Sequence, residues 1–514
     1  MSSNFQMMIG FGLYMVTMIS MGLWYSLRYK NNSPEEYFLA KRRFGPWLTA
    51  LSAQASDMSG WLLMGLPGVA YFYGLGEAFW TVLGLFIGTW VNWVLVAKRL
   101  RSYSQIASNA ITLPEFFSKR FHDSKRILLT IAAILSLLFF SIYVGSQFIV
   151  VGKLFNNLFG FDMVLMVIIG AVVVLTYTLI GGFLAVGVTD LVQGMLMVTS
   201  LTLVMIFGFF HAGGFSGIAE NLRNFPNFLS FFGVANQTGI SNGVPQFSAT
   251  GTAFSFITII SIMAWGLGYF GMPQVLVRFM AVNKTSSLKK SIYIAVIWVF
   301  IAQLAAVSIG IIGRSIFPGV FETASTSESI FIVLSRSFFP PLLAGIVISG
   351  ILAASMSSSD SYMLIVSSSL ANDIYKGIIK KDASDKTVMI IARVTMLMVT
   401  VFGVLVAALG NDSIFRVVSY AWAGLGASFG PIVLFSLFWK RTTFPAAVAG
   451  MLTGGGMVLL WKNVIASLHP MLNVYELLPA FIISCLVIFI VSLNTEKPSE
   501  AIEKEFEAAK AANF

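Results

Sequence analysis

Long apolar segments recur from one end of the chain to the other, and they constrain the fold more than any other feature of the sequence. Most of them approach or exceed the roughly 20 residues that an α-helix needs to cross a bilayer. Only 11% of the 514 residues are charged, whereas a soluble domain usually carries about 25%. The sequence therefore predicts an all-α polytopic membrane protein. We expect thirteen transmembrane helices, near residues 6–26, 48–72, 77–97, 126–155, 162–181, 187–211, 252–274, 288–314, 341–370, 388–409, 415–438, 443–467 and 474–494.

Basic residues are distributed unevenly between the predicted loops. With the N-terminus outside and thirteen crossings, the C-terminus lies in the cytoplasm, and most of the 32 lysines and arginines fall in cytoplasmic segments. Arg42 and Arg278 are both assigned to that side. Such a bias is typical of a multi-pass protein of the plasma (inner) membrane. The net charge of +10 is thus explained by the lipid bilayer, and it does not predict a nucleic-acid partner.

Cysteine and histidine are too sparse for several common kinds of site. The one cysteine, Cys485, lies in an apolar run, and the three histidines lie near the ends of different predicted spans. We therefore expect no disulfide framework, no histidine-based metal centre and no enzyme. Repeated pore-lining charges, which would indicate a channel, are not found either, so the favoured class is a transporter.

An aspartate interrupts the predicted second span (48–72), within the stretch SAQASDMSGW. An ionised carboxylate at the centre of a membrane helix costs about 2.5–3.5 kcal/mol, so Asp57 is a candidate functional residue. Neighbouring serines and Gly60 weaken the helix locally. A broken membrane helix is tolerated where its backbone groups face protein or a water-filled cavity, and free carbonyl oxygens suit a small, hard cation. The alternative is a polar kink that serves packing alone.

The predicted ninth span (341–370) carries a stripe of small and polar residues. One helical face bears Ala354, Ser357, Ser358 and Ser361. Asp360 borders this face, and Asp190 begins the predicted sixth span, so both are further intramembrane carboxylates. Backbone and hydroxyl oxygens of the stripe can complete an oxygen cage around an alkali cation, although such hydroxyls also serve as packing contacts.

The predicted seventh span (252–274) contains the stretch AWGLGYFGMP. Trp265 and Tyr269 lie one turn apart among glycines that let a ligand approach the backbone, and Pro273 closes the segment. The alternative is a pair of interfacial aromatic residues with ordinary packing. Polar, glycine-interrupted segments at corresponding places of two halves indicate an inverted-repeat transporter. The second and seventh spans lie five spans apart, so the halves are spans two to six and seven to eleven.

These observations predict the organisation of the whole chain. The loop after the sixth span shows no recognisable module, and the tail is expected to be a short polar helix that ends in solvent. The segments are a first helix and cytoplasmic loop (1–47), a first repeat (48–211), an extracellular loop (212–250), a second repeat (251–438), spans twelve and thirteen (439–498) and a cytoplasmic tail (499–514).

Six long blocks follow one another along the chain: TALSAQASDMSGWLLMGLPG (49–68), AITLPEFFSKRF (110–121), IGGFLAVGVTDLVQ (180–193), AWGLGYFGMPQVLVRFM (264–280), ILAASMSSSDS (351–361) and YAWAGLGASFGPIVLFSLFW (420–439). In content and order they resemble the sodium/solute symporter family, and within it the proline-carrying branch. This resemblance covers nearly the whole chain. It implies thirteen helices, a leucine-transporter-type core of five-plus-five inverted repeats, and sodium-driven uptake of L-proline. Sodium-driven uptake of pantothenate, choline or another small zwitterion is the alternative.

The resemblance also implies roles for single residues. Asp57 is expected to be essential for sodium coupling, and Arg42 matches a functionally important basic position. The implied sodium ligands are the backbone oxygens of Ala55, Met58 and Ala354 and the hydroxyl groups of Ser357 and Ser358. The implied contacts with L-proline are Ser59, Gly60, Trp61, Tyr143, Trp265, Tyr269 and Pro273.

Three positions depart from the pattern of the proline-carrying branch. Gln54 stands where glycine is usual, Ser358 stands where threonine is usual, and Asp360 is an additional acid. In sialic-acid relatives, an aspartate that matches Asp190 forms a second sodium site with nearby hydroxyl groups. A further hypothesis is therefore a second sodium ion near Asp190, Ser357, Asp360 and Ser361.

Overall fold

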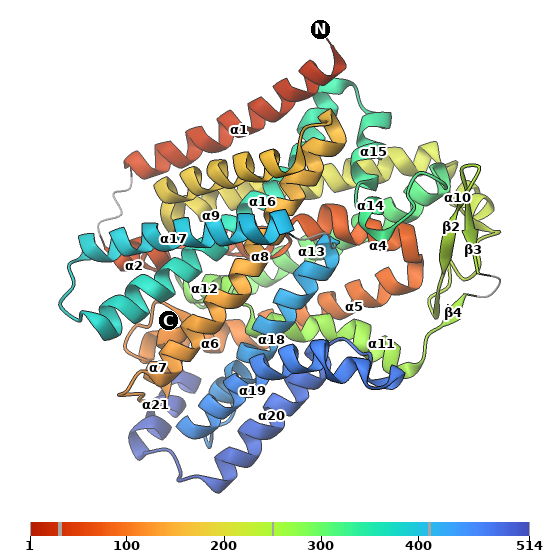
Figure 1. The fold of residues 1–514 in the computed structure, drawn as a ribbon. Helices are drawn as coiled ribbons and strands as arrows, with labels where there is room; N and C mark the ends of the chain where they lie inside the picture. Colours follow the sequence, from red (N-terminus) through yellow and green to blue (C-terminus); the bar gives the residue numbers. More distant parts are fainter. Residues whose placement is uncertain (1, 29–32, 249–250, 410–412, 513–514) are drawn as a thin grey trace.

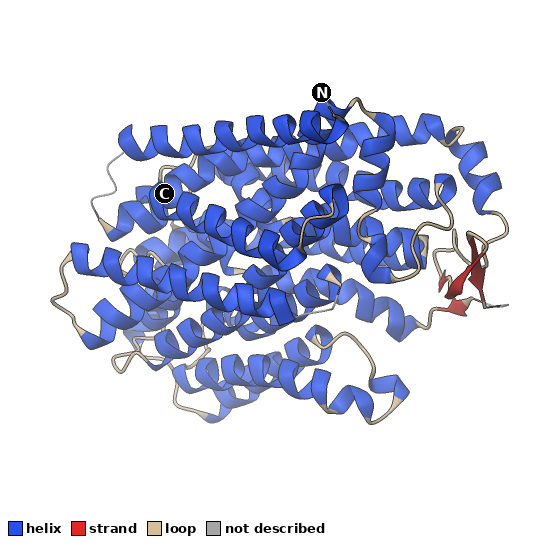
Figure 2. Ribbon diagram, turned by 45° about the horizontal axis from the view of Figure 1, so that its top comes forward, coloured by secondary structure: helices blue, strands red, loops and turns tan. Residues whose placement is uncertain are grey.

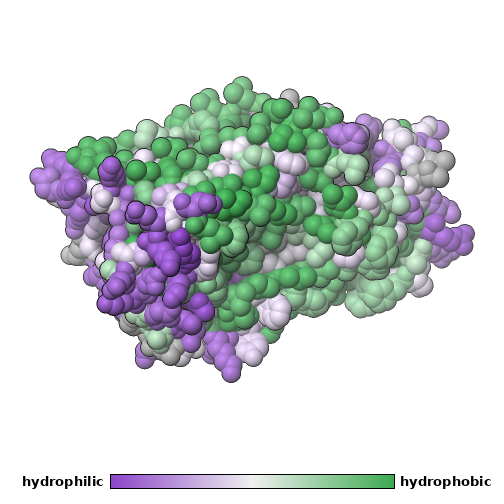
Figure 3. Space-filling view, turned by 90° about the horizontal axis from the view of Figure 1, so that it is seen from below, coloured by the Kyte–Doolittle hydropathy of each residue, from purple (hydrophilic) through white to green (hydrophobic). Residues whose placement is uncertain are grey.

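The computed structural model describes residues 2–28, 33–248, 251–409 and 413–512. Lys30 of the predicted first loop, residues 249–250 of the extracellular loop and residues 513–514 of the tail lie outside the described residues. Figure 1 shows a body built almost entirely from helices. Figure 3 shows apolar residues across the middle of one face and hydrophilic residues gathered at its two ends, as expected of a surface that meets lipid between two aqueous phases.

The fold is built mainly from helices, with η marking 3₁₀ and π segments. The long or interrupted helices are α1 (Ser3–Arg28), α3 (Pro46–Asp57), η2 (Trp61–Gly65), α4 (Leu66–Tyr73), α5 (Leu75–Val91), η3 (Asn92–Val96), α6 (Ala97–Ile106), α8 (Ile127–Phe159), α9 (Met163–His211), α11 (Phe256–Met263), η4 (Ala264–Gly271), α12 (Pro273–Met280), α13 (Ser287–Ile316), α16 (Pro341–Ser368), η5 (Ser369–Ile379), α17 (Asp385–Leu409), α18 (Ile414–Phe438), α19 (Phe444–Asn463) and α20 (Leu477–Asn494). The connecting and terminal elements are α2 (Pro34–Leu39), η1 (Ala40–Arg42), α7 (Leu113–Arg120), α10 (Gly214–Leu222), β1 (Gly233–Val234), β2 (Gln237–Ser241), β3 (Val244–Phe247), β4 (Thr252–Ala253), α14 (Ala324–Ser327), α15 (Ile330–Phe338), η6 (Ile465–Ser467), η7 (Pro470–Leu472) and α21 (Glu500–Ala511).

A multi-pass helical membrane protein is confirmed, whereas the count of thirteen spans stays a prediction. Among the described residues, ten helices are long and apolar enough to cross a membrane, or eleven if the bent pair Phe256–Gly271 and Pro273–Met280 forms one span. Two predicted spans do not meet this criterion. The second is broken, and the fifth merges with the sixth in α9, which kinks at Gly182. The φ of 65° and ψ of 175° at Gly182 lie in a region that is open essentially to glycine alone.

The predicted extracellular loop contains structure that the sequence analysis did not anticipate. Strands β2 and β3 pair in an antiparallel hairpin, which lies with the other strands at one end of the molecule in Figure 2. Asn242 and Gly243 connect the two strands, and both have positive φ. An Asn-Gly pair is a strong signal for a tight hairpin turn, so the sequence did contain evidence for this element.

The described part of the tail does not end free in solvent, which corrects the prediction. The expected helix is present as α21, but Ile502, Phe506 and Ala509 are buried where it packs against α6. The guanidinium of Arg120, on α7, lies 5.5 Å from the centre of the Phe506 ring. Because the buried residues recur at helical spacing, they form an apolar stripe within an otherwise polar helix.

Close backbone contact holds α5 against the interrupted helix η4. A Cβ atom added at Gly88 would overlap the carbonyl oxygen of Gly266, so a backbone would have to move. We expect Gly88→Ala to lower the free energy of unfolding by about 1–3 kcal/mol, as overpacking usually does. The measurement is the thermal unfolding midpoint of the purified protein in detergent. Gly456→Ala in α19 is the control, because its Cβ would meet nothing within 4 Å, and equal midpoints for the two variants would contradict the expectation.

Candidate functional site

The predicted interruption of the second span is present at the centre of the fold. α3 ends at Asp57, and Met58 leaves the helical region with φ −79° and ψ 73°. The amide of Ser59 then bonds to the carbonyl of Asp57 at 2.9 Å. The amide of Gly60 donates to Oε1 of Gln147 on α8 at 3.0 Å. Since a side chain from another helix satisfies the freed amide, the break is stable away from water.

Asp57 joins the broken second span to the broken seventh span. Its carboxylate is buried and accepts a hydrogen bond from the hydroxyl of Tyr269 at 2.7 Å. The amide of Gln274 lies 3.5 Å from the other carboxylate oxygen. Tyr269 belongs to η4 and Gln274 to α12, and the axis bends by 41° between these two elements. The carboxylate therefore connects the points at which two helices are interrupted.

Oxygen atoms of α3 and α16 meet beside this break. The hydroxyl of Ser357 lies 2.8 Å from the carbonyl oxygen of Ala55 and 3.2 Å from that of Ala354. The hydroxyl of Ser358 is buried and has no hydrogen-bond partner among the described residues, and Met58 is fully buried at the break. The structure thus brings together the predicted sodium ligands Ala55, Ala354 and Ser357, and such neutral carbonyl and hydroxyl oxygens are suited to a hard cation.

Aromatic rings surround the break on the side of the seventh span. The rings of Trp61 and Trp265 lie 5.8 Å apart, and the ring of Tyr269 meets that of Trp422 at 5.1 Å. The indole N–H of Trp422 donates to the carbonyl oxygen of Trp265 at 2.9 Å, which fixes the wall in place. Pro273 is buried as the first residue of α12, where its missing amide hydrogen costs nothing. The residues of these two spans that were predicted to contact the solute thus lie next to one another.

Tyr143 approaches the same region from α8. Its ring packs against that of Tyr362 on α16, with centroids 4.5 Å apart. The hydroxyl groups of Ser59, Tyr143 and Tyr362 are buried beside one another, and none makes a close hydrogen bond among the described residues. Buried polar groups are normally satisfied, so these hydroxyls mark a place where a polar ligand can bind.

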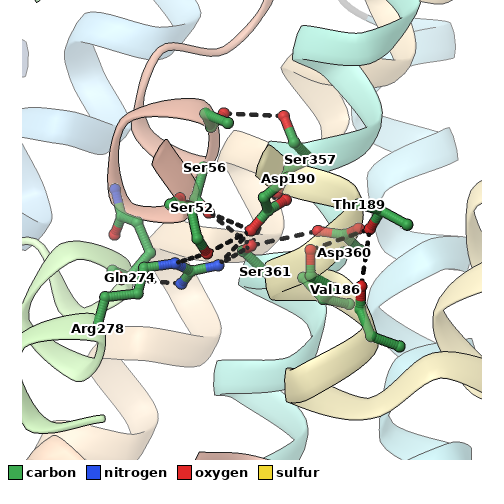
Figure 4. A network of polar contacts seen from close by, with 12 residues as sticks. Ser52, Ser56, Val186, Thr189, Asp190, Gln274, Arg278, Ser357, Asp360 and Ser361 are labelled. Atoms are coloured by element: carbon green, nitrogen blue, oxygen red, sulfur yellow. Dashed lines mark hydrogen bonds and ion pairs between the residues drawn. The ribbon is translucent and has the colours of Figure 1, made fainter. Parts of the chain in front are cut away.

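The predicted second sodium site holds a guanidinium group. Arg278 was assigned to the cytoplasmic side, but it is fully buried on α12. Its Nη2 lies 3.0 Å from Oδ2 of Asp190 and 2.7 Å from the hydroxyl of Ser361. Figure 4 shows this cluster between α3, α9, α12 and α16. Asp360 bonds to Ser361 through Oδ1 at 3.2 Å, while its Oδ2 has no partner within the described part of the chain.

Arg42 is also buried, although the sequence analysis placed it in a cytoplasmic loop. It donates to Asn109 and Ser104, and to the carbonyl oxygens of Ala110 and Met280. Burial, helped by the nearby positive charge of Arg101, lowers the pKa of Arg42 to about 10, so the group stays charged at neutral pH. Because Met280 is the last residue of α12, Arg42 anchors the end of the helix that carries Gln274 and Arg278.

Four residues of the site were missed from the sequence. Gln147 and Tyr362 lie on spans that were recognised, and the polar side chain of Gln147 within an apolar run was a usable signal. Gln274 is the last residue of the predicted seventh span and Arg278 lies beyond it; both were missed because Pro273 was taken to close the segment. Proline is common at the first position of a helix, so QVLVRFM after it was readable as a continuation of the span.

Comparison with known proteins shows the family to which the chain belongs. A model of the sodium:solute symporter family matches residues 37–454. The chain belongs to the sodium:solute symporter family. The resemblance inferred from the six sequence blocks is therefore confirmed, and the buried site described above lies within a symporter-family chain.

Individual relatives agree over almost the full length. The high-affinity proline transporter PutP of Bacillus subtilis (strain 168) is 43% identical, over 92% of this chain and 95% of its own length. The sodium/proline symporter of Haemophilus influenzae is 39% identical, over 98% of both chains. A solved Na+-coupled sialic acid symporter in a substrate-bound outward-open state has a TM-score of 0.77 at 19% identity, covering 97% of this chain and 99% of that chain. At that identity the likeness shows the fold.

The bond between Tyr269 and Asp57 is testable by itself. Tyr269→Phe leaves the buried carboxylate with only the 3.5 Å contact from Gln274. A buried acceptor that loses its partner costs about 1–3 kcal/mol, so we expect a lower thermal unfolding midpoint in detergent. Tyr293→Phe is the control, because that side chain is 61% exposed on α13. Identical midpoints for both variants would show that the bond contributes nothing to stability.

Proposed function

We propose that this protein is a sodium-coupled symporter that takes up L-proline by alternating access. The observation that carries the proposal is the meeting of two interrupted helices at Asp57, beside the oxygen cluster of α3 and α16. Family membership and the names of the relatives support sodium and proline as the transported species. In this proposal sodium is a co-substrate of transport.

Sodium is proposed to bind where the second and ninth spans meet. The ligands are the carbonyl oxygens of Ala55, Met58 and Ala354 and the hydroxyls of Ser357 and Ser358. Asp57 lies next to Met58 and bonds to Tyr269, so it transmits the presence of the ion to the seventh span. Sodium then raises the affinity for solute, and the solute must raise the affinity for sodium by the same factor.

L-Proline is proposed to bind against the aromatic wall. Its apolar ring suits the indole and phenol rings, while its charged ends need polar partners such as the unsatisfied hydroxyl groups of Ser59 and Tyr143. The full proposed set is Ser59, Gly60, Trp61, Tyr143, Trp265, Tyr269 and Pro273. The amide of Gly60 is already bonded to Gln147, so Gly60 contributes close approach of the backbone.

The energy available for accumulation is adequate for this role. Sodium entry across about 100 mV releases roughly 2.3 kcal/mol, and a tenfold sodium gradient adds about 1.4 kcal/mol. At one sodium per solute, this total of about 3.7 kcal/mol supports accumulation by roughly several hundred-fold. One coupling ion is therefore sufficient for active uptake.

The number of crossings, the orientation of the termini and the inverted repeats are part of the proposal. We propose thirteen crossings, with the N-terminus outside and the C-terminus in the cytoplasm, and two inverted repeats at 48–211 and 251–438. The helical interruptions at Met58–Gly60 and Ala264–Met272 then occupy corresponding positions of the two repeats. The remaining proposed units are 1–47, 212–250, 439–498 and 499–514. Rocking of one bundle against the other exposes the sites to each side in turn.

Uptake of radiolabelled L-proline into proteoliposomes tests the function. We expect an inward sodium gradient to stimulate uptake by the wild type, and Asp57→Cys to abolish that stimulation because the link between the two broken helices is lost. Ser357→Ala should raise the sodium concentration needed for half-maximal uptake, whereas Ser337→Ala in α15, at an exposed position, should not. Absence of sodium stimulation in the wild type would refute the proposal.

A competition assay addresses the identity of the solute. We expect an excess of unlabelled L-proline to suppress labelled uptake, and pantothenate and choline to leave it unchanged. If pantothenate or choline competes more strongly than L-proline, the protein is still a sodium-coupled symporter, but L-proline is not its solute.

A further inference from the structure

Arg278 connects three helices besides its own. Its Nε donates to the hydroxyl of Ser52 on α3 at 2.8 Å, and its Nη2 reaches Asp190 on α9 and Ser361 on α16. Its Nη1 donates to the carbonyl oxygen of Gln274, one turn earlier on α12, at 2.9 Å. Every nitrogen of the guanidinium therefore has an acceptor, and the side chain is 1% exposed.

Most of the oxygens that a second sodium ion would need are bonded to this cation or to one another, and only Oδ1 of Asp190 and Oδ2 of Asp360 have no partner among the described residues. Oδ2 of Asp190 accepts from Ser52 at 2.7 Å and from Ser56 at 3.1 Å as well as from Arg278. The hydroxyl of Ser361 accepts from Arg278 and adjoins Ser56 at 3.0 Å. An ion can shed its hydration shell only where several protein oxygens replace it. Two unpartnered carboxylate oxygens beside a fixed positive charge are fewer than that, so the residues of the predicted second site do not fit a sodium ion while Arg278 lies among them.

A guanidinium group is charged at every physiological pH, and its donors match a carboxylate. Arg278 therefore neutralises Asp190 without an ion from solution. Asp360 does not form an ion pair with it, and reaches it through the hydroxyl of Ser361. The distinctive property of the cluster is thus a positive charge that cannot leave with the solute.

We propose that Arg278 is a tethered cation that takes the place of a second sodium ion, so that one sodium is bound and moved with each solute. This inference rests on the proposed function. It also predicts that removal of the guanidinium charge leaves Asp190 without a counter-charge. The protein then requires a second monovalent cation. Arg278 is then the residue that determines ion stoichiometry.

The test counts bound ions. Equilibrium binding of ²²Na⁺ to the purified full-length protein, with the Hill coefficient of sodium-dependent L-proline uptake, gives two independent readouts. For the wild type we expect one ion per protein and a Hill coefficient close to one. For Arg278→Gln we expect two ions, a Hill coefficient that rises toward two, and half-maximal uptake at a higher sodium concentration.

Charge compensation is separated from a purely structural role by a double variant. Arg278→Gln combined with Asp190→Asn removes both charges, and should return the count to one ion. Arg336→Gln on α15, where the side chain is exposed, is the control for loss of an arginine and should also bind one ion. Asp360→Asn should likewise leave the count at one.

Several results would overturn the inference. Two ions bound to the wild type, falling to one in Asp360→Asn, would place a second ion at Asp360 beside Arg278. A count of one in folded Arg278→Gln would show that no cation replaces the guanidinium, as would an Arg278→Gln protein that stays unfolded at every sodium concentration. A wild type that binds no sodium at all would instead refute the proposed function, so the two failures are distinguishable.

Discussion

Charge held away from water is the constraint on which the interior of this protein depends. A buried carboxylate is stable only when it is paired or hydrogen-bonded. Asp57 is bonded by Tyr269 and approached by Gln274, and Asp190 is paired with Arg278. These partners all come from the interrupted seventh span. The two buried carboxylates are therefore stabilised only because that span reaches the centre of the fold.

The two helix breaks have different physical supports. At the second span, Oε1 of Gln147 accepts a hydrogen bond from the freed amide of Gly60, and Asp57 accepts one from Tyr269. At the seventh span, η4 gives way to α12 through an extended residue, Met272, and Pro273 starts the new helix. Both breaks place backbone oxygens and amides inside the protein, where a small ion and a zwitterionic solute can be recognised without bulk water. The hydrogen bond between Asp57 and Tyr269 therefore couples the movement of one broken helix to that of the other.

Much of the fold was readable from the sequence because a bilayer imposes a simple length and polarity requirement. The long apolar helices, the break near Asp57 and the hydroxyl face of the ninth span were all predicted, and family membership was inferred from contiguous blocks. Errors arose where long-range contact overrides local pattern. Arg278 follows a proline and resembles a loop residue, yet Asp190, 88 positions away, stabilises it in the core. The tail looked polar, yet Phe506 packs under Arg120.

The sequence by itself determined that this chain crosses a membrane many times, that carboxylates lie within those crossings, and which family it belongs to. These properties depend on hydropathy and on contiguous motifs, which are local. The tertiary structure alone decided which partner each buried charge has: Tyr269 for Asp57, and Arg278 for Asp190. Pairing between distant helices depends on packing geometry, and nothing in the local pattern of a helix states which neighbour it will face.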